Sequence, residues 1–309
     1  MTRRHLLIAL QVLGSVAAFA YLFSRVDVGE VWDAALGIPW VNTLSALGLT
    51  VAGLVVGAIR WRVMLKAYGA PTRPPLLELI RLYFVAIFYN TYLPGGVGGD
   101  VVRGVITRKS FGEAGATSAV TVVLVERVLG LAALLAIVAS VLLVAPPAGL
   151  DHILGYAVIG ILGAAVAVLG VAGARRVAEW FPIERLRPLL RSLPVLHRPA
   201  WFGLAILLSL GTQLLMAGVG WALLLGLAPG FRLADAIVIV PLANATAFLP
   251  ISVGGAGARE AVFVALATTA TSLDATRAAT ASMTMWGCVL LVGAVGGALQ
   301  LTRRRETDA

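Results

Sequence analysis

Charged residues and cysteine are both scarce in this sequence. Asp, Glu, Lys and Arg make up only 13% of its 309 residues, against about 25% in soluble domains. The single cysteine, Cys288, excludes a disulfide framework and a cysteine-based metal site. The three histidines, His5, His152 and His197, lie at or near the edges of apolar stretches, where interfacial positions explain them. We therefore expect no metal site.

Motifs of several enzyme classes are also missing. The chain has no G-x-x-x-x-G-K-[ST] phosphate loop, so we do not expect ATP to drive it directly. Neither the G-x-S-x-G of hydrolases nor the H-E-x-x-H of metalloproteases occurs. The string GGVGGD follows no predicted strand, which favours a break in a helix over a nucleotide site. We expect no cofactor and no catalytic residue, and interpret the chain as a non-enzyme.

Apolar residues dominate instead. They form 60% of the sequence, and the mean hydropathy is +0.94. They occur in long runs without alternation, and about 20 apolar residues are enough to cross a bilayer core. Since lipid cannot satisfy backbone polar groups, such runs must be helices, whereas barrel strands alternate over about 10 residues. The sequence predicts an all-α polytopic membrane protein with one membrane domain, residues 1–309.

Six apolar runs are long enough to span a membrane, and two more end in Gly/Pro-rich segments. The predicted spans are Leu6–Phe23, Val41–Ile59, Ala116–Ala145, Ile153–Gly173, Trp201–Leu227 and Ala278–Leu301. The other two stretches are Leu76–Leu93 and Leu233–Leu249. The first run, with its Ala18-Phe19-Ala20 triplet, also resembles a cleaved signal peptide. We favour a retained span, because the internal repeat described below requires it.

Basic residues between the runs predict the orientation of the chain. They also account for its net charge of +9, so this charge gives no reason to expect nucleic-acid binding. The positive-inside rule places loops rich in Lys and Arg in the cytoplasm. Such residues gather in alternate loops: Arg3, Arg4, Arg60, Arg62, Lys66, Arg73, Arg108, Lys109, Arg175, Arg176, Arg185, Arg187, Arg191, Arg198, Arg303, Arg304 and Arg305. The remaining loops hold only Arg25, Arg232 and Arg277. Both termini are therefore predicted to be cytoplasmic, in a plasma or inner membrane, with six full crossings.

This orientation also predicts the path of the two extra stretches. If Leu76–Leu93 crossed completely, the basic residues Arg108 and Lys109 would lie outside. Residues 76–107 are instead predicted to enter from the cytoplasm and return to it as a re-entrant hairpin. By the same reasoning, residues 233–271 enter from outside and return outside.

The two predicted hairpins carry matching sequences at their breaks. LPGGVGGDVVR at 93–103 and LPISVGGAGAR at 249–259 share six of eleven residues at an offset of 156. The flanking spans repeat at a similar offset, so residues 1–150 and 151–309 form halves of three crossings each and opposite orientation. Gly/Pro-interrupted segments in inverted repeats mark the binding sites of secondary transporters, although glycines can also serve close packing alone. The predicted helix-break residues are Pro94, Gly95, Gly96, Gly98, Gly99, Pro250, Gly254 and Gly255.

Several charged residues lie where an apolar span should be neutral. Glu126 and Arg127 are about ten residues, or about 15 Å, into a span, where a charge costs about 2.5–3.5 kcal/mol. Adjacent helical side chains diverge by about 100°, so each needs a partner from another segment. We predict a cluster around a central cavity: Asp100, Arg103, Glu126, Arg127, Arg259 and Glu260. It either locks the hairpins together or binds substrate, and arginines beside half-helix N-termini suit a phosphate.

The sequences around these charges resemble a known family. RLYFVAIFYNTYLPGGVGGDVVRGVITRK, VERVLGL and LPISVGGAGARE are similar to motifs of the lysylphosphatidylglycerol synthase transmembrane family, also called flippase-like. The resemblance extends over essentially the whole chain and implies lipid translocation. The best understood relatives add a cytoplasmic domain that transfers lysine onto phosphatidylglycerol. This chain resembles only their membrane half, so we expect no synthase activity.

Three functions follow from these observations. The leading hypothesis is a flippase or scramblase for an anionic or polyprenyl-phosphate-linked lipid, with the six charged residues as the substrate-binding residues. The first alternative is an enzyme acting on a lipid phosphate, with Asp100, Glu126 or Glu260 as acid or base. The second is an accessory subunit for a separate glycosyl- or aminoacyl-transferase, and a homo-oligomer is left open. A transporter needs a polar cavity open to one side, whereas an anchor needs none.

Overall fold

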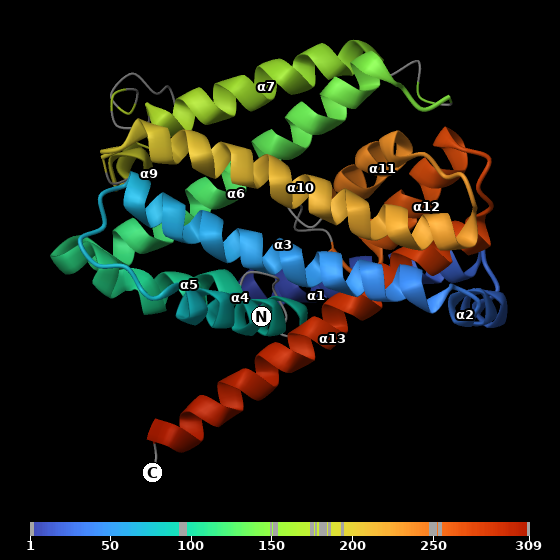
Figure 1. The fold of residues 1–309 in the computed structure, drawn as a ribbon, viewed down its shortest axis with the longest axis horizontal. Helices are drawn as coiled ribbons and strands as arrows, with labels where there is room; N and C mark the ends of the chain where they lie inside the picture. The colour runs from blue at the N-terminus through green and yellow to red at the C-terminus, as the bar shows by residue number, and fades with distance from the viewer. Residues whose placement is uncertain are drawn as a thin grey trace.

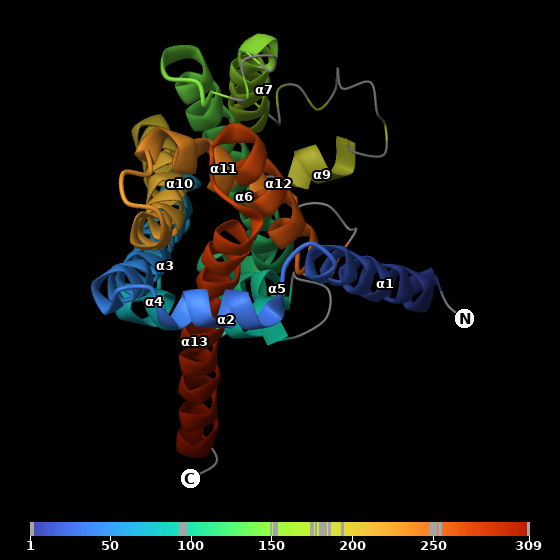
Figure 2. The same ribbon diagram turned by 90° about the vertical axis from the view of Figure 1, so that its right-hand side faces the viewer.

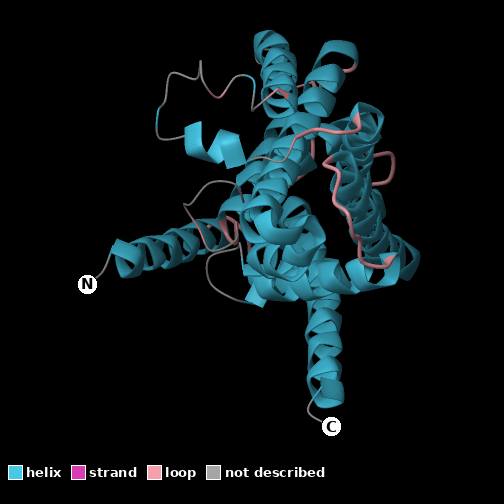
Figure 3. Ribbon diagram, turned by 90° about the vertical axis from the view of Figure 1, so that its left-hand side faces the viewer, coloured by secondary structure: helices cyan, strands magenta, loops and turns pink. Residues whose placement is uncertain are grey.

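The computed structural model describes residues 3–92, 98–148, 150, 154–173, 176, 178, 184, 187–192, 195–246, 252 and 255–307. Within these residues 85% of the chain is helical and no strand occurs (Figure 3). The all-α class predicted from the apolar runs is confirmed.

Among the described residues, five helices are long and apolar enough to cross a membrane. They are α3 (Trp40–Ala67), α6 (Gly115–Val144), α7 (Leu154–Ala172), α10 (Pro199–Leu227) and α13 (Ala275–Thr307). The first predicted span, Leu6–Phe23, lies in α1 (Arg3–Phe23). It counts as a sixth span only together with α2 (Val28–Leu36), and that pair bends by 81°. The chain is therefore a multi-pass membrane protein, whose described residues include five spans, or up to six.

Two pairs of shorter helices occupy the stretches predicted as hairpins. The helices α4 (Leu76–Tyr92) and α5 (Gly98–Thr107) flank the first break, and the 3-10 helix η1 (Arg108–Ala114) follows α5. The helices α11 (Leu233–Ala245) and α12 (Ala258–Ala270) flank the second break, and the short α9 (Arg187–Ser192) precedes α10. Both apolar stretches are thus interrupted. Five predicted break residues lie outside the described residues: Pro94, Gly95, Gly96, Pro250 and Gly254.

The first break is closed by tight packing between α4 and α5. A Cβ atom on Gly99 would lie 2.1 Å from the carbonyl oxygen of Ala86, a distance that no side chain tolerates. The Gly99 N–H donates to the side-chain oxygen of Asn90 at 2.8 Å, so α4 satisfies one of the free amides in the first turn of α5. The contact with Ala86 and the hydrogen bond to Asn90 together fix the position of the start of α5, and therefore also the position of the neighbouring Asp100.

The second break has a different local geometry. Gly255 and Gly257 have φ angles of 87° and 80°, in the left-handed region that favours glycine. The Gly257 N–H donates to Glu260 Oε2 at 2.7 Å, so α12 is capped by a residue of its own first turn. Gly99 and Gly255 are equivalent in the sequence match, yet only Gly255 adopts a positive φ.

Helices from the two predicted halves pack closely against each other. α3 lies alongside α10, α4 packs against α13, and α1 contacts α12 (Figures 1 and 2). Where α13 crosses α4, a Cβ on Gly296 would lie 1.9 Å from the carbonyl oxygen of Phe84. Small residues at such crossings let membrane helices approach to backbone contact. The two halves are therefore interleaved.

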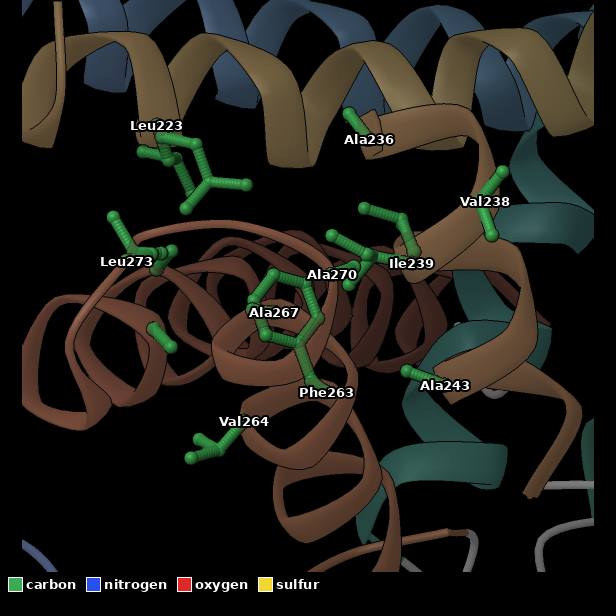
Figure 4. Packing of buried hydrophobic residues seen from close by; sticks show 14 of the residues in the cluster. Leu223, Ala236, Val238, Ile239, Ala243, Phe263, Val264, Ala267, Ala270 and Leu273 are labelled. Atoms are coloured by element: carbon green, nitrogen blue, oxygen red, sulfur yellow. The ribbon is translucent and has the colours of Figure 1, made fainter. Parts of the chain in front are cut away.

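Two buried apolar clusters hold this bundle together. One joins α10, α11, α12 and α13 and includes Leu223, Ile239 and Phe263 (Figure 4). The other surrounds Trp61 and Met64 of α3 and packs that helix on α4, α6 and α10. Fully burying one such large side chain contributes about 1.5–3 kcal/mol in water-soluble proteins, and in lipid the same close packing supplies dispersion contacts. Both clusters stiffen the helices that line the cavity described next.

Candidate functional site

A cavity of about 450 Å³ lies among helices of both halves. Its walls come from α3, α4, α5, α6, α10, α11, α12 and α13. The charged and amide side chains that line it are Arg60, Asn90, Asp100, Arg103, Glu126, Arg127, Gln213, Asn244 and Arg259. Much of the remaining wall is apolar and includes Leu49, Ile87, Met216, Phe263 and Val289. Five of the six charged residues in the predicted cluster line this cavity.

Glu126 is the centre of an ion-pair network in the cavity wall. Its side chain is only 3% exposed; Oε1 accepts from Arg60 Nη2 at 2.7 Å, and Oε2 accepts from Arg103 Nη1 at 2.9 Å. The Tyr83 hydroxyl also donates to Oε1. These donors come from α3, α5 and α4, so a single carboxylate on α6 connects four helices.

Asp100 extends the network to Arg127. Its Oδ1 accepts from Arg103 Nη2 at 2.5 Å, and its Oδ2 accepts from Arg127 Nε at 2.6 Å and contacts Arg127 Nη2. Arg103 therefore bridges two carboxylates with one terminal nitrogen each, in the charge-assisted geometry that makes arginine pairs strong. The structure thus joins four of the singled-out residues in one network: Asp100, Arg103, Glu126 and Arg127. Glu126 and the adjacent Arg127 find these partners on different segments.

Aromatic rings also hold the Arg103 guanidinium. Its Cζ lies 4.4 Å from the ring centroid of Tyr83 and 5.4 Å from that of Trp61, both within range of a cation–π attraction. Tyr83 therefore contacts both charges of the pair, because its hydroxyl binds Glu126 and its ring lies beside Arg103. Arg103 Nε has no hydrogen-bond partner among the described residues. The guanidinium thus keeps a donor that the two carboxylates do not use.

Arg259 and Glu260 form a separate pair at the start of α12. Arg259 Nε and Nη2 donate to Glu260 Oε1 at 2.9 and 2.5 Å. Glu260 is fully buried, its Oε2 is occupied by the Gly257 N–H, and it does not line the cavity. The expectation that all six residues surround the cavity is therefore wrong for Glu260, because this carboxylate caps α12. Arg259, with 16% of its side chain exposed, does line the cavity.

Arg60 is the main residue of the site that the sequence analysis missed. The predicted span ended at Ile59 and left Arg60 in a basic loop, but α3 continues past it, and its side chain is 12% exposed. Besides Glu126, it binds Ser209 Oγ of α10 through Nη1 at 3.1 Å. Its position carried a signal, since Gly53, Gly57 and Arg60 follow helical spacing along one face. That face of α3 lines the cavity.

Amide side chains complete the polar wall. Asn90 precedes the first break and Asn244 the second, and both line the cavity. Gln213 of α10 donates to the carbonyl oxygen of Gly130 at 2.9 Å, while its own Oε1 has no partner within the described residues. The wall therefore offers neutral hydrogen-bonding groups beside the arginines.

The cavity is electropositive. Four arginines line it against two carboxylates, and even with Glu260 counted as the partner of Arg259 one positive charge remains in excess. Burial strengthens this imbalance because the surrounding dielectric is low. In the described part of the chain, no three His, Cys, Asp or Glu side chains are grouped as metal ligands would be. Arginine forks bind planar or tetrahedral oxyanions through paired donors. The site is suited to an anionic group that carries an apolar tail.

Comparison with known families matches residues 8–297 to the lysylphosphatidylglycerol synthase TM region. A comparison with curated proteins gave no match. The matched region includes both breaks and every residue that lines the cavity. The chain is an integral membrane protein in a lipid-related function. It belongs, as its motifs predicted, to the family of the lysylphosphatidylglycerol synthase transmembrane region.

Proposed function

We propose that this chain moves phosphate-bearing lipids between the two leaflets of its membrane, as a flippase or scramblase. The observation that carries the proposal is the electropositive cavity inside a bundle of apolar helices. Ionisable groups are expensive at membrane depth and commonly mark substrate pathways. An anionic or polyprenyl-phosphate-linked lipid matches a cavity that offers arginines for the headgroup and apolar walls for the chain.

Arg103 and Arg259 are the proposed ligands of the phosphate. They hold equivalent positions after the two breaks and reach one cavity from α5 and α12. In the structure Arg103 is paired with Glu126 at 2.9 Å and Arg259 with Glu260 at 2.5 Å. A phosphate presents acceptors much as a carboxylate does, so it can take over arginine donors without leaving a cation unpaired. The carboxylates then stabilise the cavity between successive lipids.

We also propose that the helix pairs α4–α5 and α11–α12 are re-entrant hairpins of an inverted repeat. Each pair places an Asn before its break and an Arg after it in the cavity wall: Asn90 with Arg103, and Asn244 with Arg259. The basic loops favour cytoplasmic termini, with the hairpins entering from opposite faces. Rocking of one half against the other around a fixed site would then open the cavity to one leaflet at a time.

The two alternative functions account for less of this geometry. A membrane anchor for a separate transferase has no need of a 450 Å³ cavity lined by four arginines. An enzyme acting on a lipid phosphate needs a carboxyl group that exchanges protons readily. The oxygens of Asp100, Glu126 and Glu260 are instead occupied by hydrogen bonds from arginines, which hold these carboxylates in place as ion-pair partners. Transport explains both the charges and the apolar walls.

Headgroup translocation in proteoliposomes tests the proposal. With a labelled phosphatidylglycerol, Arg103→Ala and Arg259→Ala should each slow translocation about tenfold or more, the effect of losing a hydrogen bond between charged groups. Arg103→Lys keeps the charge without the fork and should retain partial activity. Arg277→Ala is the control, because Arg277 and its partner Asp274 are both more than half exposed. If both alanine variants moved lipid at the wild-type rate at matched protein levels, the phosphate clamp would be wrong and the accessory-subunit hypothesis would gain.

A further inference from the structure

A second cavity, of about 560 Å³, lies at the carboxyl end of α3. It is bounded by the last turns of α3, the segment between α3 and α4, and the start of α10. The residues that line this basic hollow are Ile59, Arg62, Val63, Lys66, Pro71, Arg73, Leu76 and Trp201. None of them lines the central cavity.

The charges of the basic hollow all have one sign. Arg62, Lys66 and Arg73 line it without any carboxylate, and Arg198 is close enough to Lys66 to interact with it electrostatically. Within the described residues, none of these four cations forms an ion pair. The central cavity is different, because each of its arginines has a carboxylate partner. Like charges gathered without a counter-ion repel one another, and a bound anion would relieve that repulsion.

The apolar part of the hollow lies where the boundary of a membrane is expected. Lys66 Nζ lies 3.3 Å from the ring centroid of Trp201, and a Lys–Trp pair at a helix end is typical of the boundary between headgroups and acyl chains. Ile59, Val63 and Leu76 add aliphatic wall beside the cations. The hollow thus combines a cationic rim with an apolar side, as a lipid headgroup and the first part of its chain require.

The backbone around the hollow is held in place by long-range contacts. The N–H groups of His197 and Arg198 both donate to the carbonyl oxygen of Ala67, at 3.0 and 3.1 Å. These bonds tie the start of α10 to the end of α3, and they bring Trp201 next to Lys66 although the two are far apart in sequence. The cations are therefore gathered by the fold.

We propose that the basic hollow is a separate binding site for the phosphate headgroup of an anionic membrane lipid. Clusters of Lys and Arg at the end of a transmembrane helix attract anionic lipid, and each cation near the surface raises the affinity about fivefold. The site does not depend on the proposed transport through the central cavity. The residues of α3 that line it, Ile59, Arg62, Val63 and Lys66, are different from those that line the central cavity.

Calorimetric titration of the purified full chain in detergent tests this site. Dioctanoyl phosphatidylglycerol should bind saturably and more tightly than dioctanoyl phosphatidylcholine, whose headgroup has no net charge. The Arg62→Gln/Arg73→Gln variant should bind it about 25-fold more weakly, the product of two fivefold losses. Arg277→Gln, the exposed control at another loop, should bind as the wild type does.

Two further arms separate the alternatives. Arg103→Ala should keep this binding, because Arg103 lies in the central cavity; loss of all phosphatidylglycerol binding in that variant would show that the central cavity is the only site. Glycerol phosphate binding as tightly as the lipid would identify a soluble phosphoester as the ligand and overturn the lipid assignment. Unchanged phosphatidylglycerol affinity in Arg62→Gln/Arg73→Gln would overturn the site itself. Unchanged thermal unfolding of that variant shows that a loss of affinity is not a loss of fold.

Discussion

Replacing Glu126 by Gln should destabilise the protein by about 3 kcal/mol. The substitution keeps the shape of the side chain but removes the charge that Arg60 and Arg103 share at 2.7 and 2.9 Å. Breaking a buried ion pair by removing one partner costs about 3–5 kcal/mol, and the amide oxygen recovers part of that loss because it still accepts one hydrogen bond. The network would then hold three arginines against the single carboxylate of Asp100.

The chain contains a reporter for this measurement. Cys288 is its only cysteine and is 3% exposed, so a thiol-reactive fluorophore reports unfolding as temperature rises. Glu126→Gln should lower Tm by about 5 °C. Asp274→Asn, which removes a carboxylate whose ion pair is more than half exposed, should change stability by less than about 0.5 kcal/mol.

A second substitution shows whether Glu126→Gln loses stability through an unpaired charge or through lost packing. Arg60→Met removes one of the two cations that Glu126 neutralises, so Glu126→Gln/Arg60→Met should lose less stability than the sum of the single variants. The coupling energy should be about 1–3 kcal/mol, as for residues in one ion-pair network. Strict additivity, or wild-type stability of Glu126→Gln, would refute the view that Glu126 neutralises buried arginines.

Two further predictions concern the break and the topology. Gly99→Ala should destabilise by at least about 2 kcal/mol, as overpacking does, because a Cβ there would lie 2.1 Å from a backbone oxygen of α4. Gly48→Ala, with no atom within 4 Å of its new Cβ, should be neutral or slightly stabilising; equal tolerance at both positions in thermal unfolding would contradict the close packing. In a Cys288→Ser background, an impermeant thiol reagent should label Lys109→Cys from the cytoplasmic side and Ser272→Cys from the outer side. Labelling of both from one side would rule out the proposed opposite entry of the two hairpins.

Charges in apolar runs were the most informative part of the sequence. Glu126 and Arg127 could not satisfy each other on one helix, which required partners from other segments, and Asp100 and Arg103 are the residues that meet this need. The helical class and five of the spans could be predicted from run length alone, because a segment that crosses a bilayer must be apolar over about 20 residues. The motifs also indicated the family, since they combine glycines and charges in an unusual order.

The errors have an equally physical origin. A cation at the end of an apolar run usually marks the membrane boundary, which predicts a loop position for Arg60. Here a buried carboxylate on α6 compensates its charge instead. The sequence predicts Glu260 in the cavity beside Arg259, and this is wrong because no sequence pattern shows which way the first turn of α12 faces. Glu260 caps α12 because the left-handed backbone at Gly257 directs the Gly257 N–H toward it as a hydrogen-bond donor. Gly57 shows the close packing that glycines also serve, because an added Cβ would lie 2.7 Å from the Tyr83 ring.

The distribution of the ion pairs along the chain has a consequence for synthesis. Every carboxylate–arginine pair of the first network lies between residues 60 and 127, and the second pair consists of neighbours in the sequence. A ribosome delivers the first network complete before any helix of the second half enters the membrane. The nascent chain therefore need not expose an unpaired carboxylate to lipid while it waits for distant partners. The later helices α10 and α13 close the cavity around ion pairs that the first part of the chain forms by itself, so insertion is decoupled from assembly of the site.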